Sequence, residues 1–306
     1  MDSHTPLHIK TISEYHRLVS LPKPKHPLIS LIRFENIHYK PREFPQAIVH
    51  NFYSIALKKS FDAKLRYGQQ EVDFNKGTLL FMSPMQVISA EVSAGKTLSH
   101  TGWLLLVHPD LLLHTTLSRK IKQYEYFSYK VNEALHLSAD EEQMIVAIMQ
   151  NIAQEYLTCI DNHSQDVIVA QLDLLLTYAE RFYQRQFITR TVSSHCIVDQ
   201  LEELLNTYFE SGELSLSGMP TVTYLADALN LSPNYLSRLL TTLTGQSTKQ
   251  FIIEKVVDLA KEKLCTTDLS MKEIAYILGF EHPQSFNKLF KRNTSLSPLK
   301  FRKSFQ

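Results

Sequence analysis

The sequence predicts an α+β protein of two domains, a strand-rich amino-terminal domain followed by an all-helical carboxy-terminal one. Its 306 residues exceed the usual size of a single domain. Residues 50–109 hold short runs of β-branched and aromatic residues between turn residues, as is typical of a small β-barrel or sandwich. From residue 138 onward, apolar residues recur at helical spacing.

Composition favours a globular protein of the cytosol. Hydrophobic residues make up 44% and charged residues 21%, which argues against general disorder. The sequence has no run of eighteen apolar residues, and MDSHTPLHIK lacks the order of a secretory signal, so we expect neither membrane insertion nor export. Cys159, Cys196 and Cys265 are far apart and odd in number, and we interpret them as reduced packing residues.

Three segments are predicted for the chain: an amino-terminal domain at 1–187, a linker at 188–200 and a carboxy-terminal domain at 201–306. Closely spaced prolines at 22–27 and 40–45 predict extended connections at the start. Two helices should close the first domain, one capped by Ser138 and the other beginning near Ser164. The second is apolar on several faces, which suits either an intramolecular core or a dimer contact through one group of residues. That group is Leu172, Leu175, Leu176 and Ala179.

An internal repeat dominates the second domain. TVTYLADALNLSPNYLSRLL at 221–240 recurs in outline as SMKEIAYILGFEHPQSFNKLF at 270–290. Thr221 and Ser270 are placed to cap the first helix of each copy, and Ser270 forms a capping box with Glu273. Asn230 and Gly279 suit the turns, and a proline follows each turn in the first helical position. The sequence therefore predicts two helix-turn-helix units.

The second helix of each unit should bury one face and present the other to a ligand. Spacing predicts apolar stripes that seat these helices on their partners, made of Leu236, Leu239, Leu240, Phe286, Leu289 and Phe290. The remaining side chains are of the kinds that hydrogen-bond base edges or phosphates. They are Asn234, Ser237 and Arg238 in the first unit and His282, Gln284, Ser285 and Lys288 in the second.

The segment between the units predicts a connecting helix of about 18 residues, or about 27 Å. That length suits recognition helices in successive major grooves, about 34 Å apart. The distribution of charge along the chain also favours a nucleic-acid partner for the second domain. Residues 221–306 carry 12 Lys and Arg against 7 Asp and Glu, whereas the rest of the chain carries 20 against 24. The sequence therefore predicts double-stranded DNA as the partner of the second domain.

Residues from about 205 to 305 resemble the DNA-binding domain of AraC/XylS-family transcription regulators. The resemblance lies in LSPNYLSRLL, in LGFEHPQSFNKLFK and in the ending SPLKFR, with departures at Leu240 and Ser295. It implies that the seven polar residues above face the groove, with Lys291 and Arg292 beside them at the backbone. It also implies a cupin-like sensor domain, a homodimer, a small effector that the sequence does not name, and an activator placed near RNA polymerase.

Other readings stay open beside this one. The paired helices could form only a helical core, or the chain could be an architectural DNA binder without effector control. A cupin-like dioxygenase would need a close His-x-His pair, and His50, His100 and His108 provide none, so we expect no metal, no cofactor and no enzymatic activity. Phosphate-loop and nucleophile-elbow motifs do not occur.

Overall fold

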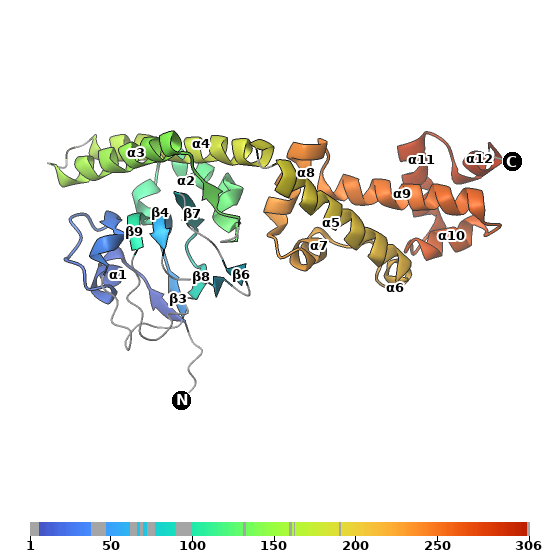
Figure 1. Cartoon of the computed structure of the whole chain (residues 1–306), viewed down its shortest axis with the longest axis horizontal. Coiled ribbons are helices and arrows are strands. Elements are labelled where there is room, and N and C mark those ends of the chain that lie inside the picture. The colour runs from blue at the N-terminus through green and yellow to red at the C-terminus, as the bar shows by residue number, and fades with distance from the viewer. Residues whose placement is uncertain are drawn as a thin grey trace, which may run out of the picture. The chain divides into compact units, whose positions relative to one another are not determined.

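The computed structural model of the chain describes residues 6–37, 47–61, 66–67, 70–71, 77–89, 100–130, 133–158, 161, 163–189 and 191–304. They fall into two compact units, Met1–Gln186 and Phe187–Gln306. Every described strand lies in the first unit, and the second is built of helices (Figure 1). The mixed class and the helical carboxy-terminal region are confirmed.

The first unit is organised around a five-stranded antiparallel sheet of order β10-β7-β4-β9-β2. Its strands are β10 (Leu135–His136), β7 (Thr78–Met82), β4 (Tyr53–Phe61), β9 (His100–Val107) and β2 (Ile29–Arg33). A smaller sheet pairs β3 (Ala47–His50) with β1 (Leu7–Ile9) in parallel and with β8 (Val87–Ser89) in antiparallel fashion. β5 (Arg66–Tyr67) and β6 (Gln70–Glu71) form a separate pair.

The expected barrel is not closed within the described part of the chain. No ladder joins the two larger sheets there, and β10 and β2 are open edges of the five-stranded sheet. The core of the unit lies on this sheet, where Ile55, Leu57, Leu79 and Leu105 are at most 1% exposed. Leu104, Leu105, Leu106 and Val107 are consecutive in β9 and at most 6% exposed. Because successive side chains of a strand point to opposite faces of the sheet, both faces of β9 are covered there.

Two long helices follow the sheet, α3 (Ala139–Leu157) and α4 (Ser164–Thr189). The Ser138 hydroxyl accepts from the Glu141 amide and the Glu141 carboxylate accepts from the Ser138 amide, the capping box that the sequence predicts. At the other end of α3, Leu31 of β2 donates its backbone N–H to the Tyr156 hydroxyl at 2.8 Å. That bond ties the end of α3 to the edge of the sheet.

The interior of α4 is part of the chain's own core. Leu172, Leu175, Leu176 and Ala179, which the sequence left open to either an intramolecular core or a dimer contact, are at most 2% exposed without any second subunit. Aromatic residues of the same unit lie against this helix. The Tyr126 hydroxyl donates to the Leu176 carbonyl at 3.0 Å, and its ring stacks on Tyr183 with centroids 5.4 Å apart. Of the two readings of this apolar helix, the intramolecular one holds.

The first 45 residues contain more regular structure than their prolines predict. Besides β1 and β2 they form α1 (Ile12–Leu18), which begins in a capping box of Thr11 and Glu14. That T-x-x-E spacing was the signal available in the sequence. The prolines at 22–27 do lie in a connection, whereas those at 40–45 fall outside the described residues.

Short helical segments connect β9 to the long helices. They are η2 (Pro109–Leu112), α2 (Leu117–Lys120), η3 (Ile121–Gln123) and η4 (Glu125–Ser128), and η1 (Phe34–Asn36) follows β2. Of the segment proposed as a linker, 188–200, the described residues are helical: Ile188 and Thr189 end α4, and the others belong to α5 (Thr191–Glu210).

The second unit continues from α5 with seven further helices. They are α6 (Glu213–Ser217), α7 (Val222–Ala228), α8 (Pro233–Thr244), α9 (Thr248–Thr266), α10 (Met271–Ile277), α11 (Pro283–Thr294) and α12 (Pro298–Lys303). One apolar cluster joins them, with Leu201 and Leu205 of α5, Leu225 of α7 and Phe290 of α11 all fully buried. In Figure 1, α7 and α8 lie at one end of α9, and α10 to α12 lie at the other.

The cysteines do not pack as expected. Cys196 and Cys265 are exposed free thiols, and Cys159 lies outside the described residues. In the described ranges no helix is both long and apolar enough to cross a bilayer. The same residues hold no group of three or more His, Cys, Asp or Glu side chains placed to bind a metal ion.

Candidate nucleic-acid interface

The first helix-turn-helix unit consists of α7, a tight turn and α8. The Thr221 hydroxyl accepts from the Tyr224 amide at 3.1 Å and so begins α7. The helix ends in a turn where Asn230 has a left-handed φ of 56°. Ser232 then caps α8 through the Tyr235 amide, with Pro233 in the first turn. Ala226, fully buried, allows α7 and α8 to cross closely.

The second unit, α10, turn and α11, repeats this geometry. Ser270 and Glu273 form a full capping box, and the hydrogen bond from the Ser270 amide lowers the pKa of the Glu273 carboxyl. Gly279 occupies the turn at φ 73°. His282 stands at the start of α11 without a side-chain capping bond, and Pro283 follows it. Ala275, like Ala226, is fully buried.

Each second helix packs through one stripe of apolar residues. Leu236, Leu239 and Leu240 of α8 are fully buried, as is Phe290 of α11, while Phe286 is 1% exposed. Leu289 is only half-buried and packs on the same cluster. The Phe286 and Phe290 rings lie 5.8 Å apart, and Phe290 meets Phe301 of α12 at 5.4 Å. Burial of these stripes turns the opposite faces of α8 and α11 toward solvent.

On α8, the three predicted contact residues differ in their surroundings. Asn234 is exposed, whereas Ser237 and Arg238 are half-buried. The Ser237 hydroxyl accepts from the Thr248 hydroxyl of α9 at 3.2 Å. The Arg238 guanidinium lies 6.0 Å from the centre of the Phe187 ring, which also meets Tyr235 at 5.1 Å. Arg238 is thus held at the edge of the outward face by a contact within the second unit.

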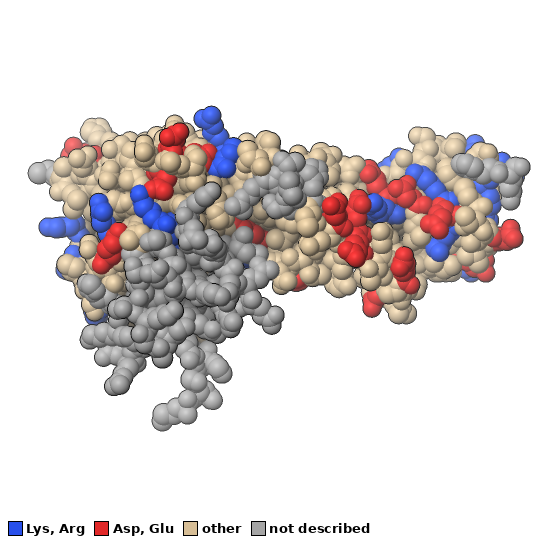
Figure 2. Space-filling view, viewed as in Figure 1, with Lys and Arg blue, Asp and Glu red and all other residues tan. Residues whose placement is uncertain are grey.

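On α11, the predicted residues share a single exposed face. His282, Gln284, Ser285, Lys288, Lys291 and Arg292 are all exposed. The helix contains no Asp or Glu, and its three cations stand within two turns. In Figure 2, basic side chains gather over the end of the second unit that carries α10 to α12, with acidic side chains among them and others over α5. This arrangement suits a polyanion along α11.

The structure adds three outward residues that the sequence reading omitted, namely Asn287, Thr241 and Thr242, all exposed. The internal repeat could have identified these residues, because α8 and α11 begin fifty residues apart. At that offset Asn287 corresponds to Ser237, and Thr241 and Thr242 correspond to Lys291 and Arg292. By contrast, Arg302 of α12 is structural, since its Nε donates to the Leu264 carbonyl at the end of α9.

A chain of polar side chains holds the two helix-turn-helix units at a fixed spacing. α9 contains 19 residues, which corresponds to about 28 Å. From its first turn, the Gln250 amide donates to the Glu254 carboxylate at 3.2 Å and to Asn293 of α11 at 3.4 Å. Glu254 also accepts from Gln246, which follows α8, at 2.7 Å. This chain of hydrogen bonds connects the end of α8 through α9 to the end of α11.

The two recognition helices end differently. α8 stops at Gly245 with φ 74°, and α11 stops at Ser295 with φ 62°, the equivalent position fifty residues later. A left-handed conformation costs a side-chain-bearing residue about 1 kcal/mol more than glycine. We therefore expect Ser295→Gly to raise the unfolding free energy by roughly 1 kcal/mol in urea titrations followed by far-ultraviolet circular dichroism.

The reciprocal change is the control for this prediction. Gly245→Ser places a side chain in the same left-handed cap of α8, where no neighbouring atom obstructs it, and should destabilise by about the same amount. A loss of stability in Ser295→Gly would contradict the expectation and would mean that the serine side chain itself contributes to the cap.

With the geometry established, the comparisons with known proteins assign the domain. A family described as a helix-turn-helix domain matches residues 225–304, from α7 to the end of α12. This part of the chain is an AraC-type DNA-binding domain. The sequence resemblance is thereby confirmed, and the AraC-type domain contains both helix-turn-helix units and the connecting α9.

Curated relatives are similar to part of the chain. The Msm operon regulatory protein of Streptococcus mutans is 29% identical over 159 residues, 52% of this chain and 55% of that protein. The raffinose operon transcriptional regulatory protein RafR of Pediococcus pentosaceus is 34% identical over 84 residues, 28% of this chain and 30% of that protein. The chain thus spans about half the length of the first relative and less than a third of the second.

A solved structure is similar to about a third of the chain. The DNA-binding domain of AdpA, described as a global transcriptional factor in complex with a target DNA, is 28% identical and covers 34% of this chain and 91% of that one, with a TM-score of 0.30.

Proposed function

We propose that the chain is a transcription regulator that binds specific sites in double-stranded promoter DNA through its AraC-type domain. The observation that carries the proposal is the pairing of two exposed polar helix faces, those of α8 and α11, on one connecting helix. Because α9 is about 28 Å long, the two faces can enter successive major grooves, which lie about 34 Å apart. The protein would act in the cytosol, at the nucleoid, without enzymatic activity.

Within this interface, base edges and phosphates are read by different residues. Asn234 and Gln284 present amides suited to adenine, and Arg238 and Lys288 present donors suited to guanine. Ser237, Ser285 and His282 hydrogen-bond bases or phosphates, and Asn287 joins them from the second unit. Lys291 and Arg292 lie one turn farther along α11, where cations contact the phosphate backbone and set the register.

The first unit has the role of a cupin-like sensor and dimerisation domain in this proposal. A small effector would shift the balance between arrangements of the two units by binding one more tightly. A homodimer would form through the outer face of α4, where Val167 and Leu174, one heptad apart, are 41% and 43% exposed. The regulator would activate transcription, with its second helix-turn-helix unit near RNA polymerase.

The decisive experiment is selection of the purified chain on random duplexes, followed by sequencing of the retained DNA. We expect two conserved blocks about 10 base pairs apart for each subunit, because each recognition helix reads one groove. A homodimer would duplicate that pair of blocks. If the retained DNA shows no motif and binding depends only on salt, the chain is an architectural binder and the specific-regulator proposal is wrong.

The sign of regulation is tested separately with a reporter placed downstream of the selected site. An activator requires that expression falls when the gene for this chain is deleted. A reporter that rises on deletion would instead assign repression, while leaving the DNA-binding part of the proposal intact.

A further inference from the structure

The chain passes from the first compact unit to the second within the last turns of α4. The first unit ends at Gln186 and the second begins at Phe187, and α4 continues to Thr189. Both residues are buried, with 2% and 1% of their surface exposed. Gln186 bonds to residues of the first unit, whereas Phe187 packs on residues of the second. One turn of helix is therefore held by both units.

In the first unit, Gln186 occupies the edge of the five-stranded sheet. Its side-chain oxygen accepts the His136 backbone N–H at 2.8 Å, and its amide nitrogen donates to the Ala134 carbonyl at 3.2 Å. These backbone groups lie on either side of Leu135 in β10, an outer strand of the sheet, so the glutamine amide takes the place of a neighbouring strand. Its loss would take this partner from both backbone groups.

Arg185 strengthens the same attachment. Its Nε and Nη2 donate to the two oxygens of the Glu141 carboxylate, at 3.1 and 2.6 Å, and Nη2 also donates to the His136 carbonyl at 2.9 Å. Two-point pairing of an arginine with a carboxylate fixes direction as well as distance. Three hydrogen bonds from Arg185 and two from Gln186 thus hold this turn of α4 to β10 and to the start of α3.

In the second unit, Phe187 packs against the first recognition helix, α8. The centre of its ring lies 5.1 Å from that of the Tyr235 ring and 6.0 Å from the Arg238 guanidinium. Tyr235 and Arg238 are three residues apart and so neighbours on the helix surface, which lets one ring support both. Because the face of an aromatic ring attracts a cation, Phe187 limits the directions in which Arg238 can point.

The second recognition helix, α11, differs from α8 at both positions that Phe187 contacts. At the fifty-residue offset of the repeat, Ser285 stands in place of Tyr235. Lys288 stands in place of Arg238, and both α11 side chains are exposed. α11 packs on α9, α10 and α12. The contact with Phe187 is therefore made by α8, and its loss should act on DNA binding through α8.

We infer that the last turn of α4, residues 185–187, is a coupling segment through which the first unit sets the direction of the Arg238 side chain. Arg185 and Gln186 are its anchors, and Phe187 is its positioning residue. The inference rests on the DNA binding proposed above and names a means of regulating it. Successive residues of an α-helix point about 100° apart, so neighbouring residues can be held from different directions. A shift of β10 would then move Phe187, and with it the guanidinium that contacts DNA.

The test is a double-mutant cycle on the full chain, with Phe187→Leu, Arg238→Ala and the double variant titrated on a selected duplex by fluorescence anisotropy. We expect Phe187→Leu to lower the affinity for DNA about fivefold. In the Arg238→Ala background the same change should cost less than about twofold, because its route to the DNA is already lost. A merely structural role for Phe187 would give additive effects.

Lys288→Ala provides the matched background, because Lys288 is the counterpart of Arg238 in α11. Phe187→Leu should keep its full effect there. Gln186→Met tests the anchor, since it keeps the length of the side chain and removes both hydrogen bonds. It should lower the affinity about threefold, and it should have almost no effect in the Phe187→Leu background. Arg185→Met should follow the same pattern and replaces Gln186→Met if that variant does not unfold cooperatively.

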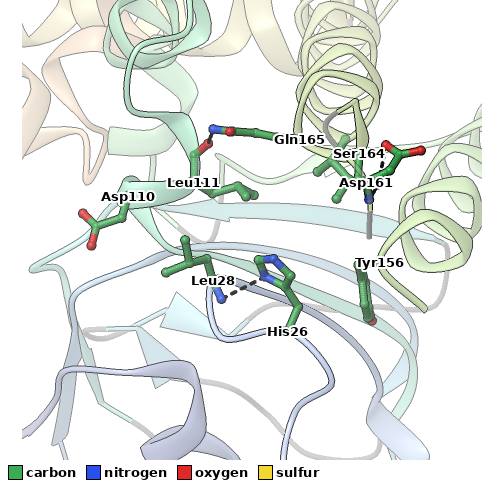
Figure 3. Close-up of a pocket in the computed structure, with 9 residues that line it drawn as sticks. His26, Leu28, Asp110, Leu111, Tyr156, Asp161, Ser164 and Gln165 are labelled. Atoms are coloured by element: carbon green, nitrogen blue, oxygen red, sulfur yellow. Dashed lines mark hydrogen bonds between the residues drawn. The ribbon is translucent and has the colours of Figure 1, made fainter. Parts of the chain in front are cut away.

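A second glutamine of α4 controls for general loosening of the helix. At the start of α4, the Gln165 amide donates to the Leu111 carbonyl at 2.8 Å (Figure 3). This bond lies at a pocket of about 430 Å³ whose lining includes His26, Asp110 and Asp161. Gln165→Met removes a hydrogen bond between α4 and the rest of the first unit, but at the end of the helix opposite the coupling segment. It should leave the affinity for DNA unchanged.

Four results would overturn the coupling. They are additive effects of Phe187→Leu and Arg238→Ala, an equal coupling of Phe187→Leu to Lys288→Ala, unchanged affinity in the anchor variants, and an equal loss in Gln165→Met. A chain that selects a DNA motif but gives any of them refutes the coupling alone. A chain that selects no motif refutes the specific-regulator proposal and the coupling together.

Discussion

Gly279→Ala is expected to unfold the second helix-turn-helix unit or to reduce the stability of the AraC-type domain by about 3 kcal/mol or more. The glycine has φ 73°, a conformation that costs an alanine about 1–2 kcal/mol. An added Cβ would also lie 2.1 Å from the Leu214 carbonyl oxygen and 3.0 Å from the Gly218 Cα. Both are backbone atoms at α6, so relief requires α6 and α10 to move apart.

Gly245→Ala separates the cost of the left-handed backbone conformation from the cost of the steric clash. Gly245 has nearly the same φ, 74°, but no atom lies within 4 Å of the position its Cβ would take. This variant should lose only the conformational part, about 1 kcal/mol. Urea unfolding followed by far-ultraviolet circular dichroism measures both, and the fluorescence of Trp103, the single tryptophan, reports the first unit separately. Equal losses in the two variants would refute the steric argument.

The triple variant Lys288→Ala, Lys291→Ala, Arg292→Ala is expected to weaken DNA binding about a hundredfold at moderate salt. All three side chains are exposed on α11, which has no acidic residue to offset them. If each neutralises one phosphate, the slope of log affinity against log salt should become shallower by about 2.7. Titration of a selected duplex at several salt concentrations measures the slope.

A control of equal charge is available in the first unit. Lys10, Arg119 and Lys122 are exposed there, and their replacement by alanine changes the net charge by the same amount. This variant should bind DNA nearly as the unmodified chain does. If both triple variants weaken binding equally, general charge rather than the α11 face accounts for the effect, and the proposed interface is wrong.

Arg238→Ala supplies the contrast between reading a base and contacting the backbone. If Arg238 reads a base, its loss should cost about 1–3 kcal/mol on the selected site and relax preference at one position. An equal loss on random DNA would instead identify a phosphate contact. The Phe187 ring that holds the guanidinium is not itself a donor to DNA, so Phe187→Leu should have a smaller effect on specificity.

The elements of the second unit were predictable because their signals are local. Caps at Thr221, Ser232 and Ser270 and prolines at 233 and 283 mark helix starts within a few residues of sequence, and the structure places α7, α8, α10 and α11 there. The same kind of signal at Thr11 and Glu14 predicts α1, but nearby prolines led to an expectation of extended chain. At both places, the residues next to the helix start are sufficient to predict where the helix begins.

Pairing between distant segments was not predictable in this way. Nothing near Leu7 in the sequence indicates that β1 pairs in parallel with β3 some forty residues later. Barrel closure likewise depends on which strand edges meet, and the described sheets remain separate. Such contacts depend on burial gained by the whole chain, so strand patterns predict strands without predicting the sheet.

The sequence by itself determined the two helix-turn-helix units, their caps and most of their outward residues, because helix periodicity and capping are short-range properties of the chain. Only the tertiary structure decided that the apolar interior of α4 is covered by its own unit, that Phe187 lies under Arg238, and that His26, Asp110 and Asp161 line one pocket. The physical reason is that the chemistry of an apolar or charged side chain determines which kind of neighbour stabilises it. It does not determine which distant segment of the chain supplies that neighbour. That choice is made when the whole core packs.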